Sequence, residues 1–105
     1  MLAALLETEG FNVLTADGGN AGIDIAEAEC PDLIITDISM PDLDGIEMTR
    51  RLREHPKCGS VPIIVLTAFG NANREWVVKA GASGFMTKPF EFISLTATIN
   101  QLLGL

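Results

Sequence analysis

The 105-residue sequence contains no tyrosine, one tryptophan and only two cysteines, and its basic residues are half as numerous as its acidic ones. Seven Lys and Arg against 14 Asp and Glu give a net charge of −7, which argues against binding nucleic acid or an anionic membrane surface through charge alone. No apolar run approaches the roughly 20 residues of a membrane-spanning helix, and no basic segment precedes a cleavable apolar one. We therefore expect no direct contact with nucleic acid or membrane.

The two cysteines, Cys30 and Cys58, match neither a disulfide framework nor a zinc-ligand spacing. Reduced thiols are typical of cytosolic proteins, so we expect a cytoplasmic protein. With 48% hydrophobic and 20% charged residues, the composition is that of a globular protein, and the length suits a single domain over residues 1–105.

Short apolar runs alternate with helical patterns along the chain. Runs too short for helices predict strands, and apolar residues at spacings of three and four predict helices. The expected strands cover 11–16, 33–35, 61–66 and 85–87, and the expected helices cover 1–10, 21–30, 45–55, 73–81 and 92–102. Gly10 and Gly81 are placed to end two of these helices.

The pattern also predicts which side chains are buried. The run 33–35 has no polar residue, which favours a strand buried on both faces, as in the middle of a parallel sheet. Ala21, Ile25 and Ala28 form the apolar stripe expected for the second helix. In the third helix Arg53, like its charged neighbours, is expected to stay in water.

Regular alternation of strands and helices, without a linker or repeat, predicts an α/β fold with a parallel sheet covered by helices on both faces. Right-handed crossovers bring the carboxyl ends of parallel strands to one edge of the sheet. Asp37, Thr67 and Lys88 each end or follow an expected strand. Each alone is equally well explained as an exposed residue at a strand end, but together they place a carboxylate, a hydroxyl and an ammonium at one edge.

This combination of groups suits phosphoryl transfer. A carboxylate can attack phosphorus and form an aspartyl phosphate. A hydroxyl and a fixed cation stabilise the charge on the phosphoryl oxygens, and a divalent ion held by further acidic groups usually completes such a site. The sequence therefore predicts a phosphoryl-accepting site centred on Asp37.

Short motifs extend the pattern beyond the three strand ends. They are Asp37 followed by Met40-Pro41 and Asp44-Gly45, then Leu66-Thr67-Ala68, Ala80-Gly81-Ala82, Gly84-Phe85 and Lys88-Pro89-Phe90. In order and spacing they resemble the receiver domains of two-component response regulators, over residues 1–105. The resemblance implies a flavodoxin-like doubly wound parallel sheet. It also implies a module that accepts a phosphoryl group from a histidine kinase or phosphotransfer protein and signals to a downstream protein partner or output domain.

The resemblance implies a role for each matching residue. Asp37 corresponds to the phosphoryl acceptor, Thr67 to the hydroxyl that moves onto a phosphoryl oxygen, and Lys88 to the cation. Phe85 takes the position of an aromatic switch whose ring rotates inward on activation. Pro89 corresponds to a cis proline, an isomer found almost exclusively before proline.

The sequence lacks the first, central strand of such a domain and the pair of adjacent acids at its end, because Met1 falls within the helix that follows that strand. The metal ligands that remain by resemblance are Asp37 and the backbone carbonyl of Ser39. They form a poor site for the Mg²⁺ expected in the family, which prefers octahedral oxygen coordination. Asp17 or Asp42 is a less favoured source of another carboxylate, since turns favour Asp in any case.

Two explanations of the short start stay open: a truncated receiver begun at an internal Met, or a natural short protein that uses the fold for binding. Without the central strand, the strands at 11–16 and 33–35 each lose a partner, and unpaired edges invite pairing with another chain. We expect the gap to be closed, either by movement of the 11–16 strand against the next one or by a second copy in a homodimer.

Two other functions stay open as well. A degenerate receiver-like interaction module, independent of phosphorylation, suits the absent acid pair but leaves Asp37, Thr67 and Lys88 unexplained. A phosphatase with an Asp nucleophile would need a second acid two residues further on, where the sequence has Ser39. We therefore do not expect a turnover enzyme.

Overall fold

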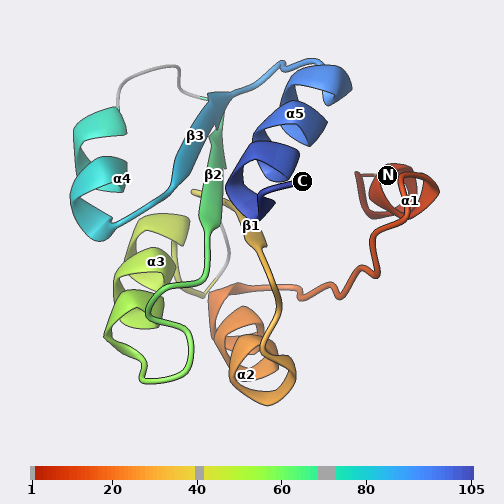
Figure 1. Ribbon diagram of the computed structural model, residues 1–105. Helices are drawn as coiled ribbons and strands as arrows, with labels where there is room; N and C mark the ends of the chain where they lie inside the picture. The colour runs from red at the N-terminus through yellow and green to blue at the C-terminus, as the bar shows by residue number, and fades with distance from the viewer. Residues whose placement is uncertain (1, 40–41, 69–72) are drawn as a thin grey trace.

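The computed structural model describes residues 2–39, 42–68 and 73–105. Its helices are α1 (Leu2–Thr8), α2 (Gly19–Glu29), α3 (Gly45–Glu54), α4 (Arg74–Ala80) and α5 (Phe92–Leu103), and its strands are β1 (Ile34–Asp37), β2 (Ile63–Thr67) and β3 (Gly84–Thr87). From α2 onward helices and strands alternate, as Figure 1 shows. The predicted α/β class is confirmed. No helix within the described ranges is long and apolar enough to cross a membrane.

The three strands form a parallel sheet in the order β1-β2-β3. All five residues of the central strand β2 are buried, as expected for a strand covered on both faces. Its side chains alternate between two apolar clusters. Ile63 and Val65 pack with residues of α3 and α4, whereas Ile64 and Leu66 pack with Leu95 and Ile99 of α5. Helices therefore cover both faces of the sheet (Figure 1).

Gly10 and Gly81 follow the ends of α1 and α4 with φ angles of +92° and +105°. This left-handed conformation is the one that glycine adopts at low cost after a helix. The two helix ends predicted from these glycines are confirmed.

Arg53 differs from its expected role as a solvated charge. Its Nε donates to Gly81 O at 2.8 Å, Nη1 donates to Val61 O at 2.6 Å, and Nη2 donates to Ser83 Oγ at 3.2 Å. Partial burial lowers the pKa of Arg53 below its usual value. The guanidinium joins α3 to the segments before β2 and β3. The charge pattern of α3 could not reveal this, because the acceptors lie elsewhere in the chain and are mostly backbone carbonyls.

The strand expected at 11–16 is wrong: these residues form neither helix nor strand, although they connect α1 to α2 as a drawn-out segment (Figure 1). A cavity of about 790 Å³ lies between this segment and β1, so the two do not pair. We expected that residues 11–16 would move against β1 or that a second copy would fill the gap. The first of these predictions is therefore wrong for the described residues. An extended segment becomes a strand only when a neighbour pairs with its backbone.

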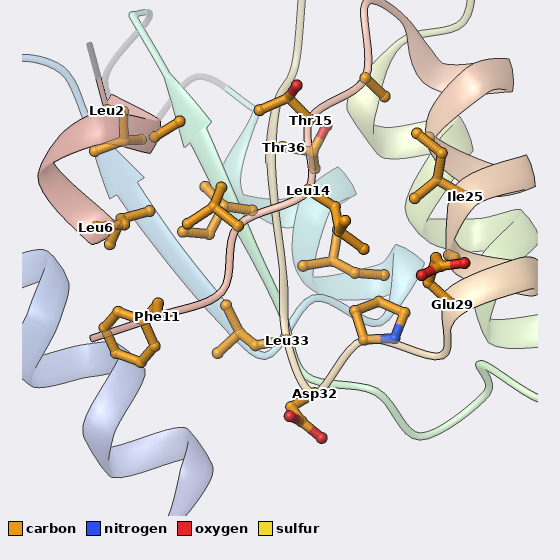
Figure 2. Close-up of a pocket in the computed structure, with 18 of the residues that line it drawn as sticks. Leu2, Leu6, Phe11, Leu14, Thr15, Ile25, Glu29, Asp32, Leu33 and Thr36 are labelled. Carbon is orange, nitrogen blue, oxygen red and sulfur yellow. The ribbon is translucent and has the colours of Figure 1, made fainter. Parts of the chain in front are cut away.

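The same cavity changes the burial expected for β1 and α2. Leu33 and Ile35 line it and are half-buried, so the run at 33–35 is not buried on both faces as predicted. In α2 the buried residues are Gly19 and Ala26, and Ile23 packs on the core beside Ala26. The predicted stripe was wrong here: Ala21 and Ala28 are exposed, and Ile25 faces the cavity (Figure 2).

Candidate functional site

The carboxyl ends of the strands bring the three polar residues singled out in the sequence together. Asp37 ends β1, Thr67 ends β2, and Lys88 directly follows β3, with its backbone N–H donating to Thr67 O at 2.7 Å. A pocket of about 120 Å³ lies at this edge. Its lining consists of Asp37, Ile38, Ser39, Leu66, Thr67, Ala68 and Lys88. The pocket therefore contains a carboxylate, two hydroxyl-bearing residues and an ammonium.

An ion pair joins the two charged groups of the pocket, with Lys88 Nζ 2.5 Å from Asp37 Oδ1. The side chains are 43% and 46% exposed, so water screens the pair and its contribution to stability is small. The same exposure leaves the Asp37 carboxylate accessible to a ligand, with a cation already beside it.

Thr67 and Ser39 line the pocket from different environments. Thr67 is 2% exposed because it belongs to the fully buried strand β2, whereas Ser39 is an exposed residue shortly after β1. The Lys88–Pro89 peptide bond is cis, the isomer that the sequence analysis expects at this position.

Phe85 lies on β3 but does not line the pocket. It packs against the cluster formed with α3 and α4, and the Arg74 guanidinium lies 5.5 Å from its ring centroid. This distance is within the range of a cation–π contact. Arg74, the first residue of α4, was missed by the sequence analysis, because neither a motif nor a spacing relates it to Phe85.

Asp42 and Asp44 lie shortly before α3, and both accept hydrogen bonds from backbone N–H groups of helices. The Asp42 carboxylate accepts hydrogen bonds from the backbone N–H groups of Gly19 at 2.9 Å and Asn20 at 3.1 Å, in the first turn of α2. Asp44 Oδ1 accepts from Glu47 N–H at 2.8 Å and caps α3. The hydrogen bond from Asn20 is the main cause that lowers the pKa of Asp42. From the sequence Asp42 is a less favoured metal ligand, and its contact with α2 cannot be predicted, because it joins residues 23 positions apart.

The described residues do not fit a magnesium site by themselves. Among them, no group of three or more His, Cys, Asp or Glu side chains is placed to hold a metal ion. One carboxylate, that of Asp37, lines the small pocket, and Asp42 is already bonded to α2. Mg²⁺ requires near-octahedral oxygen coordination, which this set does not supply.

Known proteins similar to this chain share one type of domain. The family model of the response regulator receiver domain matches residues 1–100. Protein PilH of Pseudomonas aeruginosa is 36% identical over 104 residues, which cover 98% of this chain and 86% of PilH. The response regulator PleD of Caulobacter vibrioides is 34% identical, and the match covers 97% of this chain but 23% of PleD.

Solved structures agree with these sequence matches. A putative response regulator from Chloroflexus aurantiacus superposes with a TM-score of 0.93 at 31% identity, over 100% of this chain and 87% of that one. A second structure is the receiver domain of the sensor histidine kinase PA1611 from Pseudomonas aeruginosa, described with a magnesium ion coordinated in its active-site cleft. It superposes with a TM-score of 0.91 at 31% identity, over 99% of this chain and 86% of that one. This chain therefore belongs to the family of response regulator receiver domains.

Proposed function

We propose that residues 1–105 are a single receiver module of a two-component phosphorelay, in which Asp37 accepts a phosphoryl group from a histidine kinase or a phosphotransfer protein. The observation that carries this proposal is the pocket where Lys88 Nζ lies 2.5 Å from Asp37 Oδ1 and Thr67 forms the wall. A carboxylate nucleophile beside a fixed cation and a hydroxyl is the arrangement that phosphoryl transfer requires.

In the proposed step, an Asp37 carboxylate oxygen attacks the phosphorus of a phosphohistidine. The new P–O bond forms as the P–N bond breaks, and the electron pair leaves with the imidazole, which departs neutral because its other ring nitrogen carries a proton. Negative charge then resides on the phosphoryl oxygens, next to the Lys88 ammonium that Asp37 held before. The Thr67 hydroxyl donates a hydrogen bond to one of these oxygens. Lys88 and Thr67 thus act by stabilising the charge on the phosphoryl oxygens.

Phe85 and the surface around it carry the signal in this proposal. On phosphorylation the ring turns inward, and its cation–π contact with the Arg74 guanidinium is lost. This loss changes the surface formed by β3, α4 and α5. Trp76, Val78 and Ile93 are 62%, 59% and 76% exposed on the two helices. Exposed apolar side chains of this kind suit contact with a downstream protein partner or an output domain.

The proposed step depends on Asp37, Thr67 and Lys88. The described carboxylates do not form the Mg²⁺ site expected for the family.

We place the protein in the cytoplasm, and its two free cysteines support that placement.

A homodimer that pairs through the open edge of β1 stays a prediction. Light scattering during size-exclusion chromatography measures the oligomeric state directly.

The test is intact-mass spectrometry after incubation with acetyl phosphate, with and without Mg²⁺. We expect one phosphoryl adduct, absent in Asp37→Asn. Asp32→Asn is the matched control, because Asp32 is an exposed carboxylate at the opposite end of β1 and should leave the adduct unchanged. A folded wild-type protein that gains no adduct contradicts the proposal.

A second function follows from one observation, the lack of a metal-binding group among the described residues. In this alternative the chain is a receiver-like interaction module that works without phosphorylation. It predicts that a protein partner binds wild type and Asp37→Asn equally, whether or not acetyl phosphate is present. Neither function is a turnover enzyme, so hydrolysis of a phosphomonoester with multiple turnovers would contradict both.

A further inference from the structure

The contact between Arg74 and Phe85 joins α4 to β3 outside the candidate phosphoacceptor pocket. The Arg74 guanidinium lies 5.5 Å from the centroid of the Phe85 ring, within the range of a cation–π interaction. Arg74 is the first residue of α4, and Phe85 is the second residue of β3. One charged side chain therefore connects the start of this helix to the strand.

The Arg74 charge has an aromatic partner where other basic residues have a carboxylate. Within residues 2–39, 42–68 and 73–105, Arg74 makes no ion pair, although the chain contains 14 acidic residues. By contrast, Lys79 of the same helix pairs with Glu75, with Nζ 3.2 Å from Oε1. A cation–π interaction requires the cation to lie over the face of the ring. The environment of the Arg74 charge therefore depends on the position of the Phe85 ring.

Burial and backbone pairing fix the two elements that provide the contact. Val77, three residues after Arg74, is fully buried in the cluster against which Phe85 packs. Residues three apart share a face of a helix, so Val77 sets the side of α4 from which Arg74 extends. On the strand, Phe85 is the partner of Val65 in β2. A change in the contact therefore comes from the two side chains and not from the backbone.

The sheet register relates Phe85 to the wall of the pocket. Thr67, which lines the pocket, lies two residues after Val65 on β2, and Val65 is the register partner of Phe85. Alternate residues of a strand point to the same face of a sheet. Phe85 and Thr67 are therefore diagonal neighbours on the face that α3 and α4 cover. A ring that moves on this face changes the surroundings of the pocket wall.

We propose that Arg74 is a positioning residue that regulates the candidate phosphoacceptor site. Its guanidinium holds the Phe85 ring in the half-buried position and lowers the fraction of unphosphorylated chains in which the ring is turned inward. This inference rests on the proposed function, in which the ring turns inward when Asp37 is phosphorylated. Because inward movement breaks the cation–π contact, Arg74 opposes activation in the absence of a phosphoryl donor.

The first test measures how fast the phosphoryl adduct forms with acetyl phosphate. Arg74→Gln removes the charge and keeps a long side chain, and it should gain the adduct about two- to fivefold faster than wild type, the factor expected for an exposed cation–π contact. Loss of a positive charge by itself would slow the reaction with an anionic donor, so a faster reaction identifies the ring contact. Arg74→Lys keeps the charge and should restore the wild-type rate.

Lys79→Gln is the matched control. Lys79 Nζ also lies 5.5 Å from an aromatic ring, but that ring belongs to Trp76, which is 62% exposed on α4. This variant removes the same charge from the same helix and should not form the adduct faster. In a Phe85→Leu background, Arg74→Gln should have no further effect, because the ring is absent. Equal rates for Arg74→Gln, Lys79→Gln and wild type would overturn the inference.

A second measurement, on the unphosphorylated chain, separates this inference from the proposed function. Fluorine NMR of protein labelled with para-fluorophenylalanine follows the Phe85 ring, whose signal is the one that Phe85→Leu removes. We expect relaxation dispersion of this signal in Arg74→Gln, because the ring then exchanges between two positions, and much less in wild type and Lys79→Gln. If wild type gains no adduct, the proposed function fails while the spectra still test the contact. Identical dispersion in all three proteins would overturn the inference.

Discussion

The strands β1 and β2 belong to one sheet but have different surroundings. β2 pairs with a strand on each side, and all five of its residues are buried. β1 pairs with β2 on one side, and on its other side a cavity of about 790 Å³ separates it from residues 11–16. Both strands contain consecutive isoleucines, yet Ile35 of β1 is half-buried whereas Ile63 and Ile64 of β2 are fully buried. The burial of a strand therefore depends on what pairs with it and covers it, as well as on its own composition.

The largest expected effect is a loss of stability when an isoleucine is replaced in one of these two strands. Ile35 and Ile64 are partners across β1 and β2, but Ile64 is fully buried and Ile35 is half-buried beside the cavity. Ile64→Ala should lower the free energy of unfolding by about 2–5 kcal/mol, and Ile35→Ala by about 1 kcal/mol. Denaturation with urea measures both. Equal losses would mean that the cavity is closed in solution.

The second effect concerns the pocket itself. Lys88→Gln removes the cation beside Asp37 and should slow formation of the phosphoryl adduct about 100-fold, because a fixed charge stabilises the transition state. Its Tm should change little, since the ion pair is half exposed. Lys79→Gln is the control: Lys79 also pairs with a carboxylate, that of Glu75, but on exposed α4. Similar rates for both variants would exclude a specific role for Lys88.

A smaller effect is expected where the loop after β1 meets α2. Asp42→Ala removes the acceptor for Gly19 and Asn20 and should lower Tm by about 4 °C at pH 7. The pKa of Asp42 is lowered in the folded chain, so the carboxylate stabilises the fold above the unfolded pKa. This contribution is lost as pH falls through the folded pKa. Thermal melts at pH 7 and pH 2.5 should therefore show the difference between variant and wild type shrinking in acid.

The smallest effect lies on the exposed side of α3. Hydrogen bonds from Arg50 and Arg51 lower the pKa of Glu47 to about 2. Its contribution is present above the ordinary pKa of 4.5 and lost as pH falls toward 2. Glu47→Gln should lower Tm by about 1 °C at pH 7 and low salt. Added salt should reduce the difference, and a salt-independent loss would point to packing instead.

Much of the fold and of the site follows from local patterns. Short apolar runs predicted β1, β2 and β3, and the glycines at 10 and 81 predicted two helix ends. Since parallel strands end at one edge, Asp37, Thr67 and Lys88 could be placed together before any coordinates. The ion pair of Asp37 with Lys88 agrees with that placement.

Other features depend on distant parts of the chain and could not be read from local patterns. Arg53 is bonded to carbonyls 8 and 28 residues away, and Asp42 to amides more than 20 residues before it. Arg74 reaches Phe85 because α4 packs beside β3. Residues 11–16 have a strand-like composition, yet they are not a strand, because a neighbour must supply the hydrogen bonds.

Local spacing and the handedness of the connections are enough to predict the order of elements, the α/β class and the meeting of three polar groups at one sheet edge. The sequence did not show which apolar residues of β1 and α2 are buried and which face the cavity. The physical reason is that burial and backbone pairing need a partner, and the partner's presence is a property of the assembled sheet.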